Sequence, residues 1–153
     1  MAQITGKVKR SRKFKNTNCG YALVRDIVFG SIYEAEEYCT ANGYDPNVWI
    51  EADSDAVLSK CQQIARAALP CLCQARDEQK ILFETLCRET RAEAAAFEAA
   101  KEKHELGWEV HRDCLQHAIG KVDGCYAGME IICRRITMLE RIIRIKPTKG
   151  CIN

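Results

Sequence analysis

Residues 83–143 of the chain read FETLCRET RAEAAAFEAA KEKHELGWEV HRDCLQHAIG KVDGCYAGME IICRRITMLE RII, and this stretch decides the fold. Alternating steps of four and three residues give an unbroken series, typical of a helix face that packs on another helix. Three polar interruptions near its middle, Lys101, His104 and His111, indicate a long packing helix rather than a uniform dimeric zipper. The series is Phe83, Cys87, Thr90, Ala94, Phe97, Lys101, His104, Trp108, His111, Leu115, Ala118, Val122, Cys125, Met129, Ile132, Ile136, Leu139 and Ile143.

Three glycines interrupt the second half of this stretch at four-residue spacing, Gly120, Gly124 and Gly128. An interior glycine costs a helix about 1 kcal/mol, so we favour a turn at Gly120–Gly124. This turn would separate a long helix over about 74–119 from a C-terminal helix over about 125–145, which folds back as an antiparallel partner. In the alternative, a continuous helix, the glycines form a smooth groove that another backbone can approach closely.

The expected C-terminal helix carries more apolar surface than one partner helix would bury. We therefore expect it to contact another subunit, so that the protein is a homo-oligomer. The residues predicted to make this contact are Ile132, Ile136, Leu139 and Ile143.

Two shorter helices are expected upstream. Ser31 and Glu34 have the spacing of a capping box, which predicts a helix over about 32–41, and Gly43 stops it with a left-handed backbone position. A second helix is expected over about 54–69. Pro70 ends or kinks it, because proline lacks the amide donor and clashes with the preceding turn.

The segments beside these helices are less regular. Residues 21–29 are rich in β-branched and aromatic side chains and suit either a strand or a first helix. Residues 44–52 are expected to form a loop. The predicted fold class is all-α, a long helical hairpin or small helical bundle with a basic N-terminal arm.

The length of 153 residues suits one domain. We expect a helical domain over 19–146, preceded by an arm over 1–18 and followed by a tail over 147–153. The formal net charge of +2 names no partner, but the arm is strongly basic and has too few apolar groups to form a core. It could lie on neighbouring proteins of the same assembly or make non-specific contact with nucleic acid. Its cations are Lys7, Lys9, Arg10, Arg12, Lys13 and Lys15.

Ten cysteines are many for a chain of this size, and no secretory signal or membrane span is recognisable. The thiols have three interpretations: small core residues, disulfides formed outside a reducing compartment, and metal ligands. Cys19 and Cys151, near the two ends, are our candidates for intersubunit disulfides. Bonds within the subunit, rather than between subunits, are expected for Cys71, Cys73, Cys87, Cys125 and Cys133.

Metal chemistry and catalysis find little support. His111, Cys114 and His117 lie at three-residue spacing, but on one helix the outer two diverge by about 120° and would not converge on one ion. We expect the histidines to lie in a helix interface beside Trp108. No phosphate-binding loop or nucleophile motif is present. We therefore expect no cofactor, no metal site and no enzymatic activity.

Residues 31–69 carry a series of local features: a helix start at Glu34-Ala35-Glu36-Glu37-Tyr38, a break at Gly43, Trp49, a helix start at Ala52-Asp53, Lys60, and Ile64-Ala65-Arg66. In these features the segment resembles the N-terminal helices of head-tail connector (adaptor) proteins from tailed bacteriophages. The resemblance implies a mostly helical, non-enzymatic protein that forms a ring in the neck of a virion.

The cysteines show two similar spacings, since nine residues separate Cys61 from Cys71 and ten separate Cys114 from Cys125. This spacing resembles that of a second family, the coiled-coil-helix proteins of the mitochondrial intermembrane space. That resemblance implies an accessory protein with disulfides across a helical hairpin. Our leading hypothesis is a structural virion subunit made in the host cytoplasm. The alternatives are the mitochondrial hairpin protein and a metal-binding helical bundle.

Overall fold

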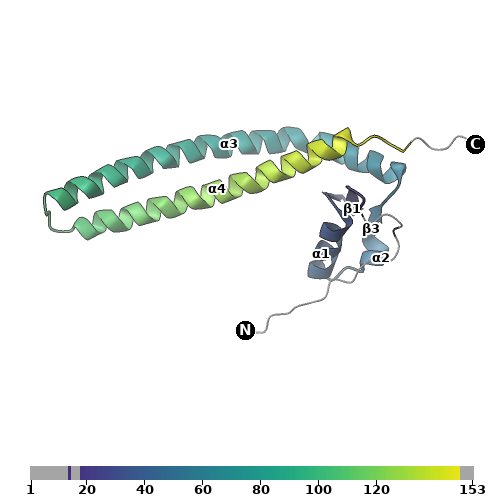
Figure 1. The fold of residues 1–153 in the computed structure, drawn as a ribbon, viewed down its shortest axis with the longest axis horizontal. Coiled ribbons are helices and arrows are strands. Elements are labelled where there is room, and N and C mark those ends of the chain that lie inside the picture. Colours follow the sequence, from purple (N-terminus) through teal and green to yellow (C-terminus); the bar gives the residue numbers. More distant parts are fainter. Residues whose placement is uncertain (1–13, 15–17, 149–153) are drawn as a thin grey trace, which may run out of the picture. The chain divides into compact units, whose positions relative to one another are not determined.

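The computed structural model describes residue 14 and residues 18–148 (Figure 1). They fall into two compact units. The mixed unit contains the described residues up to Pro70 and those from Thr137 onward, and the hairpin unit is Cys71–Ile136. Helices dominate both units, which confirms the helical-hairpin fold class, and the mixed unit adds a three-stranded sheet that the all-α description lacks.

The sheet of the mixed unit is antiparallel, with strand order β2-β1-β3. β1 (Ala22–Val24) pairs with β2 (Ile27–Phe29) on one side and with β3 (Ile50–Ala52) on the other. Residues 21–29 are therefore a hairpin of two strands. β1 is fully buried because it lies in the centre of the sheet, whereas each outer strand has exposed or half-buried positions.

Helix α1 (Ile32–Asn42) has the ends that the sequence predicts. The Ser31 hydroxyl accepts a hydrogen bond from the Glu34 amide at 3.2 Å, and the Glu34 carboxylate accepts one from the Gly30 amide at 3.1 Å. Gly43 ends the helix at φ 72°, a left-handed conformation that suits glycine.

The predicted loop over residues 44–52 is wrong in detail, because most of it is regular. Asp45 caps a single helical turn, α2 (Pro46–Trp49), by accepting a hydrogen bond from the Asn47 amide at 3.0 Å, and β3 follows at once. Proline suits the first position of a helix, where its missing donor would have no partner. Ile50 is fully buried, and this burial selects the extended conformation beside β1.

The core of the mixed unit joins the sheet, α1 and the parts of two long helices that belong to it. These helices are α3 (Asp55–Glu102) and α4 (Trp108–Arg144). The side-chain amide of Gln62 donates to three carbonyl oxygens near the end of α4, those of Ile142, Ile143 and Ile145. The buried residues include Cys19, Ala22, Val24, Ile32, Ala35, Cys39, Ile50, Leu58, Cys61, Ala65, Leu139 and Ile142.

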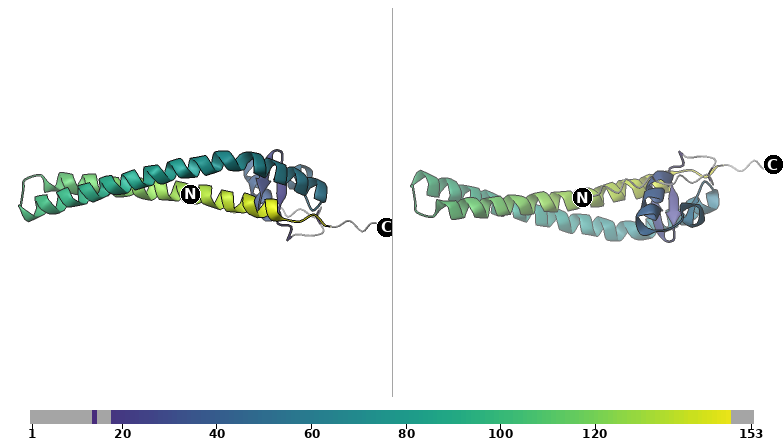
Figure 2. Two further views of the ribbon diagram at one scale, coloured as in Figure 1. Left: turned by 90° about the horizontal axis from the view of Figure 1, so that it is seen from above. Right: turned by 90° about the horizontal axis from the view of Figure 1, so that it is seen from below.

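In the hairpin unit, α3 and α4 lie side by side and antiparallel (Figures 1 and 2). Ring contacts mark their register: Phe83 lies 5.9 Å from Tyr126 and Phe97 lies 6.0 Å from Trp108, between ring centroids. The four-three series faces inward on both helices, since its members there are buried or half-buried except for Lys101 and His104. The series therefore identifies the packing face correctly.

The turn of the hairpin lies earlier than predicted. α3 ends at Glu102 and α4 begins at Trp108, so the turn is not at Gly120–Gly124 and α4 runs unbroken through all three glycines. Residues 103–107 are exposed, with positive φ at His104 and Gly107. A turn in this exposed segment lets the inward residues of α4 pack against α3 along the hairpin. The burial of these residues outweighs the cost of the three glycines within α4.

Pro70 lies inside α3 and does not end it. Both Pro70 and Arg66, whose carbonyl loses its helical donor, are exposed. Water can therefore satisfy that carbonyl, while inward residues before and after the proline stay packed.

Candidate functional site

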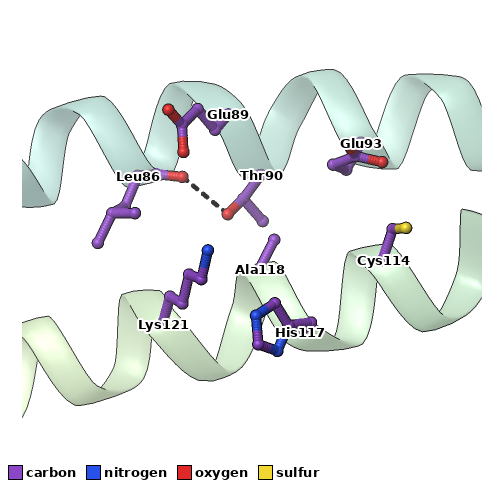
Figure 3. Close-up of a pocket in the computed structure, with 8 residues that line it drawn as sticks. All are labelled: Leu86, Glu89, Thr90, Glu93, Cys114, His117, Ala118 and Lys121. Atoms are coloured by element: carbon purple, nitrogen blue, oxygen red, sulfur yellow. Dashed lines mark hydrogen bonds between the residues drawn. The ribbon is translucent and has the colours of Figure 1, made fainter.

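A shallow groove of about 280 Å³ runs between α3 and α4 in the hairpin unit (Figure 3). Lys121 extends from α4 toward α3, and the Thr90 hydroxyl donates to the Leu86 carbonyl at 2.8 Å. The lining residues are Leu86, Glu89, Thr90 and Glu93 from α3, with Cys114, His117, Ala118 and Lys121 from α4.

The groove combines a thiol, an imidazole, an ammonium and two carboxylates, which are groups that serve in catalysis and in metal binding. A nucleophilic thiol needs a base within hydrogen-bond reach, and no hydrogen bond joins Cys114 to His117, both of which are exposed. Over the described part of the chain, no three His, Cys, Asp or Glu side chains are grouped so that they could hold a metal ion. The lining mixes these polar groups with apolar surface, including Leu86 and Ala118.

The predicted histidine placement is only partly correct. His111 is half-buried on the packed face near Trp108, while His104 and His117 are exposed.

The predicted partner contacts also need correction. Ile136 and Leu139 are only 4% and 1% exposed, and Ile132 and Ile143 are half-buried. They pack within their own chain, because the earlier turn brings α3 alongside the whole of α4.

Of the two cysteines predicted to form intersubunit disulfides, Cys19 and Cys151, the structure describes only Cys19. Cys19 is buried in the mixed unit, where its Sγ donates to the Tyr21 carbonyl at 3.2 Å, so a bond to a neighbour would require it to leave the core. Cys151 lies outside the described residues, as do the six cations of the basic arm. All nine described cysteines are thiols.

Two buried thiols of the mixed unit, Cys39 and Cys61, have raised pKa values. Burial raises the pKa of Cys61 to about 11, with smaller contributions from Cys19 and Glu51. Burial likewise raises the pKa of Cys39, assisted by Glu36 and Asp45. Because the thiolate is the reactive form, these buried thiols are poor nucleophiles.

An aromatic cluster on the mixed unit has a structural explanation. The Arg25 guanidinium lies 5.8 Å from the Tyr44 ring centroid and 5.4 Å from that of Trp49, and it donates to the Tyr44 hydroxyl at 3.1 Å. These contacts fasten the turn between β1 and β2 to α2. Trp49 remains 40% exposed beside Val48, which is 66% exposed.

The outer α4 face, defined as Gly120, Gly124, Ala127, Gly128 and Ile131, is the most unusual surface of the hairpin unit. Gly120, Gly124 and Ile131 each follow an inward residue by two positions, which is about 200° around the helix. A Cβ added at any of the three glycines would meet no atom of the described chain within 4 Å. Ile131 is 69% exposed.

Opposite charges lie at the two ends of this face. Asp113 precedes Gly124 by eleven residues, and Arg135 follows it by eleven. Asp113 is exposed and pairs with Arg112 at 3.4 Å, whereas Arg135 is half-buried. The sequence contained the signal for this face, namely small residues at four-residue intervals followed by Ile131, but the same glycines also suited a turn.

Comparisons with protein families, with characterised proteins and with solved structures find no match for this chain. Within the described residues, no helix is long and apolar enough to cross a membrane.

Proposed function

We propose that this protein is a structural subunit rather than an enzyme, and that two copies pair through the outer α4 faces of their hairpin units. The observation that carries the proposal is the open line of Gly120, Gly124 and Gly128. Glycine at these positions lets a second helix approach the backbone of α4 closely. The exposed Ile131 at the end of the line supplies apolar surface for that contact.

The three glycines are costly to helix α4. Each destabilises a helix interior by about 1 kcal/mol relative to alanine, so the three together cost about 3 kcal/mol. Within the described chain, no neighbouring atom occupies the space that a side chain at these positions would fill. A second helix packed there would bury the open line of glycines, and this burial would offset the cost of the glycines.

A two-fold axis at Gly124 makes the face complementary to itself. With the two α4 helices antiparallel, Gly120 of one copy lies opposite Gly128 of the other, and Asp113 lies opposite Arg135. The opposite charges then meet at both ends of the contact, as an isologous interface requires. The parallel arrangement places like residues together, including Asp113 on Asp113, and is disfavoured.

The wider assembly that we propose is a virion neck or head-tail connector, on the strength of the resemblance in residues 31–69. These residues form α1, α2, β3 and the beginning of α3 in the mixed unit. The paired-cysteine alternative is weaker, because Gln79 rather than a cysteine lies against Cys125. Even the nearer of the two paired cysteines of α3, Cys71, lies eight residues from Gln79, about 12 Å along the helix, so the two cysteine pairs do not face each other.

A charge exchange tests the pairing. Asp113→Arg should weaken association measured by sedimentation velocity, because it places a second positive charge near Arg135 of the other copy. Arg135→Asp should do the same, and the double variant that combines Asp113→Arg with Arg135→Asp should restore it. Glu84→Arg, at an exposed position of α3, is the matched control. A double variant no better than either single variant would contradict the two-fold arrangement.

The connector role needs a separate test. Negative-stain electron microscopy of concentrated protein should show closed rings of uniform size. Particles no larger than a dimer at all concentrations would contradict a connector ring while leaving the pairing of α4 intact.

A further inference from the structure

Two thiols of the hairpin unit, Cys73 of α3 and Cys133 of α4, lie at the same level of the helix pair. The Cys125 Sγ lies 3.6 Å from both the backbone oxygen and the side-chain oxygen of Gln79, which fixes one point of the register. From there, Cys73 is six residues away along α3 and Cys133 is eight residues away along α4. In antiparallel helices both steps run in the same direction, over about 9 and 12 Å.

A second contact between α3 and α4 gives an independent measure of the register. From the Phe83–Tyr126 ring contact, Cys73 is ten residues away and Cys133 is seven, or about 15 and 10 Å. Measured along the helix axes, Cys133 lies about 3 Å farther than Cys73 from the Cys125–Gln79 contact, but about 5 Å less far than Cys73 from the Phe83–Tyr126 contact. The two cysteines therefore lie within one helical turn of the same level.

Cys73 and Cys133 lie on the same side of the helix pair. Each follows a half-buried residue of the packed face by one position, Leu72 on α3 and Ile132 on α4, and is turned from it by about 100° in the same sense. In antiparallel helices, positions turned in the same sense from the packed face lie on one side of the pair. The pKa of Arg76 is raised chiefly by its hydrogen bond to Asp77 and by the charge of that residue, and in addition by Cys73 and Cys133. Both thiols are half-buried, at the edge of the packed face, where a small oxidant can reach them.

We propose that Cys73 and Cys133 form a redox modification site, which a low-molecular-weight disulfide converts to a disulfide bond joining α3 to α4. One thiolate attacks the reagent RSSR, forms a mixed disulfide and releases RS⁻. The second thiolate attacks the protein sulfur of that mixed disulfide and releases another RS⁻. The two cysteines lose two electrons and two protons, and RSSR becomes two RSH.

No other two cysteines in residues 71–136 meet this condition. Cys71 is exposed and lies about 200° around α3 from Cys73, so it faces away from α4. Cys125 faces Gln79, and the register places Cys87 and Cys114 opposite residues other than cysteine. The inference does not depend on the proposed pairing of two copies, because both thiols belong to one hairpin.

Peptide mapping tests the site on the full chain. The reduced protein is incubated with oxidised glutathione, its remaining thiols are blocked, and it is digested with trypsin without reduction. The expected product joins residues 67–76 to residues 122–134. Those peptides also contain Cys71 and Cys125, so Cys71→Ser and Cys125→Ser are the matched controls.

The product should persist in both controls and disappear in Cys73→Ser and in Cys133→Ser. Wild-type protein should also melt at a higher temperature after oxidation, and dithiothreitol should reverse the shift. Circular dichroism checks that each variant remains helical. A product that survives Cys73→Ser, a link found only between two chains, or glutathione adducts without a protein disulfide would each overturn the proposal.

Discussion

The side-chain amide of Gln62 donates a hydrogen bond of 2.8 Å to the carbonyl of Ile145, 83 residues later in the chain. The same amide also reaches the Ile142 and Ile143 carbonyls, at 3.2 and 3.3 Å. The last carbonyls of a helix lack partners within it, so Gln62 of α3 serves as a cap for α4 inside the mixed unit.

Replacing this cap should destabilise the protein measurably. Gln62→Ala removes this donor from the Ile143 and Ile145 carbonyls, while the Ile142 carbonyl still accepts from the Ile145 amide. We therefore expect the free energy of unfolding to fall by about 1–2 kcal/mol in urea titrations. Gln63→Ala, at the exposed neighbouring position, is the control and should change it by less than about 0.5 kcal/mol. Equal losses in the two variants would show that the amide contacts contribute nothing.

Two glycine substitutions should have opposite effects. At Gly30 an added Cβ would lie 3.0 Å from the Met138 Cγ and 3.1 Å from the Arg141 Nη2, so Gly30→Ala should destabilise the fold by about 1 kcal/mol or more. At Gly120 the space is open, so Gly120→Ala should stabilise the monomer by about 1 kcal/mol through helix propensity. Urea titrations at low protein concentration measure both, and a destabilising Gly120→Ala would contradict the open outer face.

Stability should fall at alkaline pH because of Cys61. Its pKa in the folded protein is about 11, above the ordinary value, so the unfolded chain loses this proton first as pH rises. The contribution is complete below the unfolded pKa and is lost from about pH 9 up to 11, by at most about 3 kcal/mol. Urea titrations at pH 8 and pH 10 should show a smaller loss in Cys61→Ala than in wild type, and an equal loss would refute the assignment.

Alkylation should follow the burial of the thiols. With iodoacetamide at pH 7.5, Cys71 and Cys114 should react first because they are exposed, and Cys39 and Cys61 should react last because they are buried and their pKa values are raised. Mass spectrometry at timed intervals gives the order, with urea-unfolded protein as the control. Early modification of Cys61 would mean that the core of the mixed unit opens readily.

Local signals predicted part of the fold well. The Ser31 cap and the Gly43 stop depend on neighbouring residues, and both are confirmed. The four-three series identifies the packed face because its phase continues across the true turn, from Phe97 to Trp108. These features need no knowledge of distant contacts.

The errors arose where distant packing overrides local preference. Pro70 and the α4 glycines are unfavourable in helices, yet inward residues on either side hold both helices together. β3 is a strand because Ile50 pairs beside Val24, a contact that its own short segment cannot indicate. The sequence predicts the outer α4 face only as an alternative, because the glycines form a groove only if the hairpin turns before them.

The central claim is that two copies pair through the glycines of α4, and sedimentation equilibrium of wild type and Gly124→Leu tests it most directly. In the monomer leucine at position 124 meets open space and has a better helix propensity, so the variant should stay folded. Ala92→Leu, at an exposed position of α3, is the matched control. We predict that wild type and control associate as concentration rises while Gly124→Leu remains monomeric. Equal association of Gly124→Leu and wild type, or a wild-type monomer at all concentrations, would contradict the account.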